Sequence, residues 1–221
     1  MKQQAQFTPN CASLLAHPRI VIGTDDMYEK IWWADEPFST LAEVVPALYE
    51  RTVTINGVSK SHAMTGWRIG FAGAPISLIK AMDKLQSQST SNTSSVSQAA
   101  AVEALTGQQD SIEDMRKVYE RRRNMVVDML NAAPGLRCHK PEGAFYVFPD
   151  MRGCMGKTTA GGKKIETDED FTIALLEETG VATVHGAAFL SPGHFRISYA
   201  TSDAALSEAC TRIQKFCAGM K

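Results

Sequence analysis

The sequence predicts an α/β protein in which a layered half is followed by a small α+β unit. Short apolar runs at 19–24 (RIVIGT) and 51–57 (RTVTING) are typical of buried strands, and a helix-capable stretch at 41–50 separates them. Strands that alternate with helices in this way favour a sheet covered on both faces. The composition changes after a long amphipathic stretch at 111–133, which indicates a second unit.

The first half begins with the end of a helix, ASLLAHP, which Pro18 stops. After the two strands, a third apolar segment follows at 68–75 (RIGFAGAP). A helix is then expected at 76–87, because four apolar residues recur at helical spacing: Ile76, Ile79, Met82 and Leu85. The Ser/Thr-rich segment SQSTSNTSSVSQ leads directly into another helix, QAAAVEALTG, so we interpret it as an ordered loop.

The second half opens with the long helix at 111–133, which ends before Pro134 and Gly135. The expected strands lie at 136–140 (LRCHK), 143–150, 181–186 and 194–200, and the expected helices at 168–179 and 205–217. These elements form a small α+β unit. We therefore place the domain boundary on the long helix, which gives domains at residues 1–115 and 116–221.

Composition excludes several classes of protein. The chain of 221 residues has a formal net charge of -1 and no long basic stripe, so no nucleic-acid partner is expected. Its five cysteines form no CxxC pair, which fits core packing in a reducing compartment. Without a signal-peptide pattern or a run of about 18 apolar residues, we expect a cytoplasmic protein with no membrane partner. No histidine stands at a metal-ligand spacing, so no metal site is predicted.

The stretch NGVSKSHAMTGWRIGFAGAP places one lysine and one arginine among small residues between two apolar runs. Lys60 follows a predicted strand, where a lysine is costly to bury unless it has a partner or a chemical role. Arg68 comes shortly after it, and Asp25 and Tyr28 form a D-x-x-Y pattern at the end of the first strand. Each residue alone is usually a solvated side chain, and an isolated D-x-x-Y spacing has little meaning.

This constellation resembles the class I and II aminotransferases, enzymes of pyridoxal-phosphate fold type I. The stretches GVSK, which ends at Lys60, and MTGWRIG, which contains Arg68, follow the lysine signature of the family. The resemblance implies that residues 1–115 are part of the αβα sandwich of the pyridoxal-phosphate-binding large domain. Residues 116–221 would be the small C-terminal α+β domain. It further implies a homodimer with pyridoxal 5'-phosphate as the cofactor.

The resemblance also assigns roles to the four residues. Lys60 would hold the cofactor as a Schiff base and later carry the proton as a general base and acid. Arg68 would bind the phosphate of the cofactor with its planar fork of donors. Asp25 would keep the ring nitrogen protonated, so that the ring can accept electrons, and Tyr28 would donate a hydrogen bond to the phenolic oxygen.

A second motif, HFRISYATS, resembles the family's site for the substrate carboxylate. Arg196 would grip the α-carboxylate of an amino acid. Together with QSQSTSN, this motif most resembles the bacterial aspartate aminotransferase subgroup. The implied reaction moves an amino group between an amino acid, aspartate, and a 2-oxo acid, 2-oxoglutarate.

The sequence also departs from the family. Family chains are longer, and the part that normally precedes HPRIVIGTDD has no counterpart here, so the chain corresponds to the C-terminal portion of a family member. That part would supply further phosphate contacts, an aromatic residue that stacks on the ring, and strands of the large-domain sheet. Gly57 also stands where some branches carry a hydroxyl. The alternative function is therefore a catalytically inactive fragment that serves as an oligomerisation or interaction module.

Overall fold

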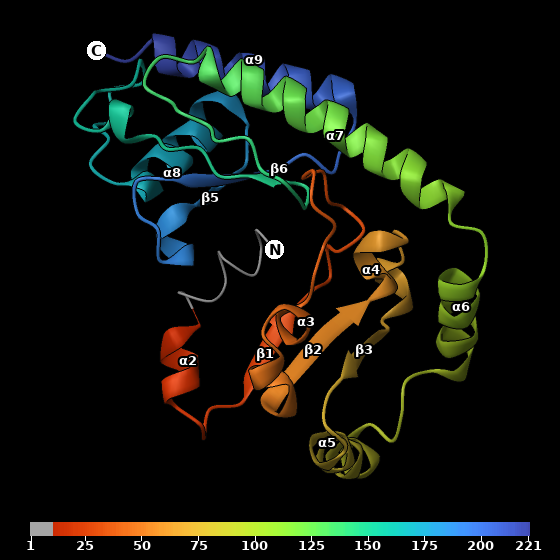
Figure 1. The fold of residues 1–221 in the computed structure, drawn as a ribbon. Helices are drawn as coiled ribbons and strands as arrows, with labels where there is room; N and C mark the ends of the chain where they lie inside the picture. The colour runs from red at the N-terminus through yellow and green to blue at the C-terminus, as the bar shows by residue number, and fades with distance from the viewer. Residues whose placement is uncertain (1–10) are drawn as a thin grey trace. The chain divides into compact units, whose positions relative to one another are not determined.

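The structure is a computed structural model, and it describes residues 11–221. The chain divides into two compact units, the first of which reaches to Asp114, and the second of which comprises Met115–Lys221. Each unit contains one three-stranded sheet (Figure 1). None of the helices within residues 11–221 is long and apolar enough to cross a bilayer.

The sheet of the first unit has the strand order β1-β2-β3. Strand β1 (Ile22–Asp25) runs parallel to β2 (Thr52–Gly57), and β3 (Gly70–Gly73) runs antiparallel to β2. The register pairs Asp25 with Ile55 and Gly57 with Gly70. The ends of β1 and β2 and the start of β3 therefore lie at one edge of the sheet.

The first unit also contains these helices: α2 (Ala12–Ala16), α3 (Leu41–Val44), the 3₁₀-helix η1 (Pro46–Arg51), α4 (Val58–Ser61), α5 (Ile76–Ser89) and α6 (Ser95–Thr106). The expected helix at 41–50 divides into α3 and η1, because a proline removes a backbone donor and disfavours helical geometry at the preceding residue. Val45, which precedes Pro46, accordingly has φ -129° and ψ 75°. A buried cluster joins α2, β1, α3 and η1: Cys11, Ile22, Val45 and Leu48, with Leu14, Leu41 and Val44 packed against it.

The predicted strand at 19–24 is wrong at its first three residues, because β1 begins only at Ile22. The guanidinium of Arg51 explains the difference. It donates to the carbonyl oxygens of Leu14 (2.6 Å), His17 (2.7 Å) and Ile20 (3.2 Å). The backbone before β1 is therefore bound by a side chain instead of a neighbouring strand.

The first unit also leaves apolar side chains of its sheet and helices exposed. Ile55 of β2 and Phe71 of β3 are exposed. The predicted stripe on α5 exists, but Ile76 is 68% and Leu85 74% exposed, and α5 buries none of its residues. The helical pattern predicted the helix correctly without predicting its burial.

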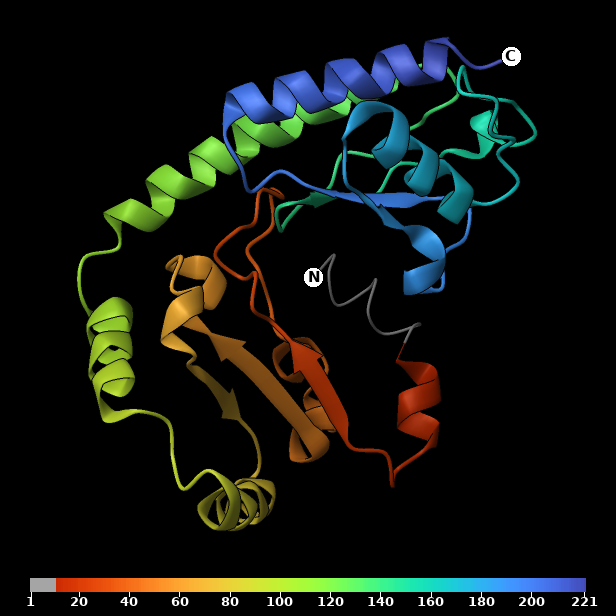
Figure 2. The same cartoon turned by 180° about the vertical axis from the view of Figure 1, so that it is seen from behind.

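The second unit has an antiparallel sheet in the order β4-β6-β5, with β4 (Tyr146–Val147), β5 (Val184–His185) and β6 (Phe195–Ser198). Helix α7 (Asp110–Asn131) begins in the first unit, and α8 (Asp168–Thr179) and α9 (Asp203–Ala218) complete the second. Helix α9 runs alongside α7 in both views (Figure 2), where the Gln214 side chain donates to the Met129 carbonyl at 2.7 Å. Phe195 packs against Phe171 in the core, with ring centroids 5.0 Å apart.

The predicted strand at 136–140 is wrong. Only Arg137 pairs with another segment, in an isolated bridge to Asp150. The side chain of Asn131, at the end of α7, accepts from the Cys138 N–H at 2.8 Å and donates to the Cys138 carbonyl at 3.0 Å. A side-chain amide thus occupies the groups that a strand partner would have bound.

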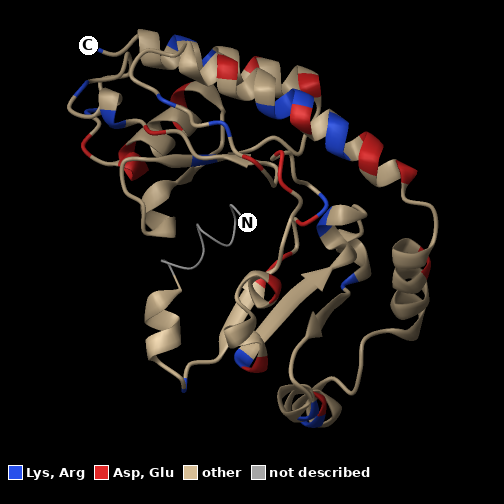
Figure 3. Ribbon diagram, viewed as in Figure 1, with Lys and Arg blue, Asp and Glu red and all other residues tan. Residues whose placement is uncertain are grey.

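The structure contains the interspersed charges and the buried cysteines that the sequence predicts. Acidic and basic residues are interspersed along α7 (Figure 3). Arg121 and Arg122 on this helix pair with Asp203 at the start of α9, at 2.7 and 2.6 Å. All five cysteines are unpaired and buried. Packing is therefore the role that the structure gives to these thiols.

Candidate functional site

One edge of the first sheet gathers three of the predicted site residues. Asp25 is the last residue of β1, Lys60 follows the end of β2, and Arg68 precedes β3 (Figure 1). In sheets with parallel strands, ligands bind beyond the carboxyl ends of those strands. The topology therefore brings together residues that are far apart in the sequence, at an edge suited to a ligand.

Lys60 lies in α4, the short helix that follows β2 without a loop, and its side chain is half-buried. Gly57, the last residue of β2, makes this connection possible. A Cβ atom on Gly57 would lie 3.1 Å from both the Gly70 Cα and the Ile69 carbonyl oxygen, and 3.2 Å from the Met27 sulfur. A side chain at this position would therefore crowd the start of β3, and glycine lets the two backbones approach closely immediately before the helix that carries the lysine.

Arg68 lies in a strained turn. Its backbone adopts the left-handed conformation, with φ 52°, and Ala63 has φ 53°. Non-glycine residues in this region cost of order 1–3 kcal/mol and concentrate at functional sites. The exposed Arg68 guanidinium donates to the Thr65 carbonyl at 2.9 Å, which fixes its stem and leaves further donors of the fork for a ligand.

The turn after β1 carries the D-x-x-Y pair. The exposed Asp25 carboxylate accepts the Met27 N–H at 3.4 Å. Tyr28 is half-buried, and its carbonyl accepts the Ile31 N–H at 2.8 Å, which closes the turn. Both residues therefore lie on a hydrogen-bonded segment at the ligand edge of the sheet.

The structure adds two polar residues at this edge that the sequence did not indicate, Asp26 and His62. Oδ2 of Asp26 and Nε2 of His62 are buried and have no hydrogen-bond partner among the described residues. Burial raises the pKa of the Asp26 carboxyl, and the negative charges of Glu29 and Asp25 raise it further. Unpaired buried polar atoms are uncommon, so their presence beside Asp25 and Lys60 is consistent with a polar ligand. Only burial could have identified them, because neither forms a sequence motif.

The second unit presents Arg196 on β6, the central strand of its sheet. Side chains alternate between the two faces of a strand, and directly paired residues share a face. The pairs Tyr146–Ser198 and Val184–Arg196 therefore put Tyr146 and Arg196 on one face. The buried Phe195 belongs to the opposite face, which packs on the helices.

Two aromatic rings lie against the Arg196 guanidinium. Its central carbon is 4.7 Å from the ring centroid of Tyr146 and 4.4 Å from that of Phe189. Both distances fall within the range of cation–π interactions. The sequence did not indicate these rings, because neither Tyr146 in the predicted strand at 143–150 nor Phe189 in the loop before HFRISYATS has a spacing that points to Arg196.

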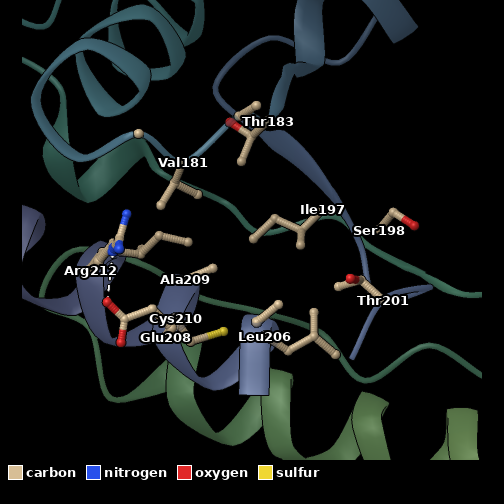
Figure 4. Close-up of a pocket in the computed structure, with 14 residues that line it drawn as sticks. Val181, Thr183, Ile197, Ser198, Thr201, Leu206, Glu208, Ala209, Cys210 and Arg212 are labelled. Atoms are coloured by element: carbon tan, nitrogen blue, oxygen red, sulfur yellow. Dashed lines mark hydrogen bonds and ion pairs between the residues drawn. The ribbon is translucent and has the colours of Figure 1, made fainter. Parts of the chain in front are cut away.

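A pocket of about 400 Å³ also lies in the second unit (Figure 4). Val181, Ile197 and Leu206 line its apolar part, and the ion pair between Arg212 and Glu208, at 2.8 Å, forms its polar side. Because Ile197 faces this pocket, its neighbour Arg196 lies on the other face of β6. The pocket is therefore separate from the candidate carboxylate site.

The chain belongs to the class I and II aminotransferases. Residues 11–213 match the sequence model of the family described as aminotransferase class I and II. The fold agrees: the structure is similar to the crystal structure of the aspartate aminotransferase from Rhizobium meliloti, with a TM-score of 0.94, 51% identity, and coverage of 99% of this chain and 55% of that chain. The predicted family and the pyridoxal-phosphate fold type I are confirmed.

Individual relatives of the chain carry names that include a substrate. The chain is 57% identical to an aspartate/prephenate aminotransferase of Cereibacter sphaeroides over 98% of this chain and 54% of the relative. It is 53% identical to an aspartate aminotransferase of Rhizobium meliloti over 96% of this chain and 52% of the relative. An aromatic aminotransferase from Pyrococcus horikoshii has a similar structure, with a TM-score of 0.82 and 36% identity, over 94% of this chain and 53% of that one. The chain spans about half the length of the curated relatives it matches.

Proposed function

We propose that this chain is the part of a pyridoxal-phosphate-dependent aminotransferase that carries the reactive lysine, Lys60, and the substrate arginine, Arg196. The observation that supports this proposal most is the gathering of Asp25, Lys60 and Arg68 at one sheet edge in a member of the class I and II aminotransferases. The reaction moves an amino group between aspartate and a 2-oxo acid.

The residues present fit the cofactor. The Lys60 amine would hold the aldehyde carbon, Arg68 the phosphate, Asp25 the ring nitrogen and Tyr28 the phenolic oxygen. The buried Oδ2 of Asp26, which has no hydrogen-bond partner in the described part of the chain, supports a polar occupant of this edge. When bound, pyridoxal phosphate supplies an electron sink for negative charge that develops on the α-carbon of the substrate.

Each residue then has a defined task. Lys60 moves a proton at Nζ, accepting it in the neutral form and returning it in the charged form. Arg68 stays in place, because its turn is held by the bond to Thr65. Asp25 accepts a hydrogen bond at the end of a rigid strand, where its position is set by the pairing with Ile55. Arg196 binds the substrate α-carboxylate in a bidentate manner.

The finer features are proposals of the same kind. Two curated relatives are named aspartate and aspartate/prephenate aminotransferase, which supports aspartate as the donor and either 2-oxoglutarate or prephenate as the acceptor. The two compact units support a division into part of the cofactor-binding large domain, 1–115, and the small domain, 116–221. The five unpaired thiols support a reducing, cytoplasmic setting. We infer a homodimer from family membership alone.

Transamination with Lys60→Ala tests the proposal. The variant should lose at least about 100-fold in rate, because general acid–base catalysis contributes about 10²–10⁴-fold and the cofactor attachment is lost as well. Lys80→Ala, which removes an exposed lysine from α5, is the matched control and should retain the rate. Both acceptors are assayed side by side with aspartate.

Retained activity in Lys60→Ala would refute the assignment of this lysine. A wild-type chain that folds but neither binds pyridoxal phosphate nor transaminates would favour the alternative function, an inactive oligomerisation or interaction module. Size determination of that chain by light scattering then distinguishes an assembled form from a monomer.

A further inference from the structure

We propose that Tyr146 and Phe189 are positioning residues that orient the Arg196 guanidinium for the substrate carboxylate. This inference rests on the role of Arg196 in the proposed function. The two rings reach the guanidinium from different elements, Tyr146 from β4 and Phe189 from the 3₁₀-helix η4 (Gly186–Phe189). They form an aromatic clamp, defined as Tyr146 and Phe189.

The clamp acts without using the hydrogen-bond donors of Arg196. In the described part of the chain, Arg196 forms no ion pair and its guanidinium makes no hydrogen bond, so its contacts with the two rings are what the structure offers to hold it. A cation–π contact fixes a guanidinium through its face and leaves the five N–H groups at its rim available. A carboxylate partner would compete with the substrate for those donors. Aromatic rings orient the fork and leave it able to bind a carboxylate.

The Phe189 ring is itself held by its loop. The Gly186 N–H donates to the His194 carbonyl at 2.7 Å, and the Ala187 N–H donates to the buried Asp168 carboxylate at 2.7 Å. The Phe189 ring meets Phe148 edge to face at 5.9 Å, and Phe148 stacks on His194 at 5.4 Å. The loop and the aromatic contacts therefore define where Phe189 lies.

Tyr146 is fixed by a different set of contacts. Its backbone pairs with that of Ser198 on β6, and Ser198 lies two residues after Arg196. This pairing fixes the position of the Tyr146 backbone relative to Arg196. Its ring packs against Phe145 with centroids 4.8 Å apart. Phe145 in turn contacts Tyr119 of α7 at 5.4 Å, which connects this half of the clamp to the core of the unit. Both halves of the clamp are thus set by the fold before any substrate binds.

The kinetic test replaces each ring by leucine, which keeps apolar volume and removes the π-face. Tyr146→Leu and Phe189→Leu should raise KM for aspartate by about 2- to 30-fold, the factor that corresponds to the strength of cation–π contacts. The value of kcat and the uptake of pyridoxal phosphate should change little. Tyr146→Phe and Phe189→Tyr should restore KM, because both restore an aromatic face. Tyr49→Leu, at an exposed site in the first unit, is the control.

A second readout does not depend on activity. The rings should shift the Nε–H resonance of Arg196 in the NMR spectrum by their ring currents and slow its rotation, and addition of succinate, a dicarboxylate that cannot react, should perturb it further. The leucine variants should lose the ring-current shift, while the aromatic exchanges retain it. If the wild-type chain proves inactive, this measurement still judges the clamp, so the failure of the proposed function is distinguishable from the failure of the inference.

The inference is overturned by either of two results. One is a KM that stays at the wild-type value in both leucine variants of an active chain. The other is an Arg196 Nε–H resonance whose position and mobility are the same in wild type and in both leucine variants. A fall in kcat as large as the rise in KM, which Tyr146→Phe and Phe189→Tyr fail to reverse, would also contradict the inference. That pattern indicates a structural defect.

Discussion

Asp168 is the residue whose replacement most directly probes the loop that carries Phe189. It is the first residue of α8, is 3% exposed, and accepts the Ala187 N–H through Oδ2 at 2.7 Å. Burial acts to raise the pKa of this carboxyl, but hydrogen bonds from the backbone N–H groups of Ala187, Asp168 and Gly193 outweigh it, so the pKa lies below its ordinary value. The native fold therefore contains an ionised, buried carboxylate that ties a loop to a helix start.

The expected cost follows from these contacts. A hydrogen bond to a charged group contributes about 1.5–3 kcal/mol, so Asp168→Ala should destabilise the loop by roughly that amount. This range corresponds to about 10- to 150-fold lower protection of the Ala187 amide against hydrogen exchange. Asp168→Asn keeps one acceptor but removes the charge at the helix N-terminus, so it should lower the protection of the Ala187 amide less than Asp168→Ala does. Glu169→Gln, at the exposed next position of the same helix turn, is the matched control.

Hydrogen exchange followed by mass spectrometry on the peptide around Ala187 measures this effect locally. The sign of its pH dependence is fixed, because the folded pKa of Asp168 is lowered. Its contribution is present above the unfolded pKa of about 3.9 and is lost as the pH falls through the lower folded pKa. Wild type and Asp168→Asn should therefore converge in strongly acidic solution. An Ala187 amide equally protected in Asp168→Ala and Glu169→Gln would refute the reasoning.

Two further predictions concern the packing of each unit. Tyr199 is fully buried and its hydroxyl donates to the Ala144 carbonyl at 2.9 Å. Tyr199→Phe should therefore destabilise the second unit by about 1–3 kcal/mol. Thermal unfolding followed by circular dichroism measures this effect, with Tyr119→Phe as the control. Gly57→Ala should destabilise the first unit by about 1–3 kcal/mol, because the new methyl group is overpacked against the β3 backbone, whereas Gly23→Ala, whose nearest neighbour is 4.0 Å away, should be tolerated. Tryptophan fluorescence in a urea titration reports the second comparison, since all three tryptophans lie in the first unit, and equal midpoints for the two variants would contradict it.

The sequence predicted most elements correctly where one local signal dominated. The helix at 76–87 and the closing helix at 205–217 have clear periodicity, and the structure contains both as α5 and α9. The strand predictions at 19–21 and 136–140 were wrong, because the side chains of Arg51 and Asn131 bind the backbone of Ile20 and Cys138, which a strand partner would otherwise have bound. Such bonds from a side chain to the backbone leave no pattern in the segment that they bind.

The candidate site was predicted for a different reason. Lys60, Arg68 and Asp25 were proposed from a family resemblance, and the structure adds the sheet register that brings them to one edge. The surroundings of the site were not predictable. The Asp26 oxygen that has no hydrogen-bond partner within residues 11–221 is visible only through burial, and the contact of Phe189 with Arg196 depends on a loop that Asp168 binds.

The most direct test of the account is the identity of the lysine that binds pyridoxal phosphate. The purified chain is mixed with the cofactor, its visible absorption spectrum is recorded, and borohydride reduction is followed by peptide mapping. We predict one dominant adduct on Lys60 that disappears in Lys60→Ala and is unaffected in Lys80→Ala. An absence of any adduct, or labelling spread over exposed lysines such as Lys80 and Lys84, would contradict the claim that this sheet edge is a cofactor site.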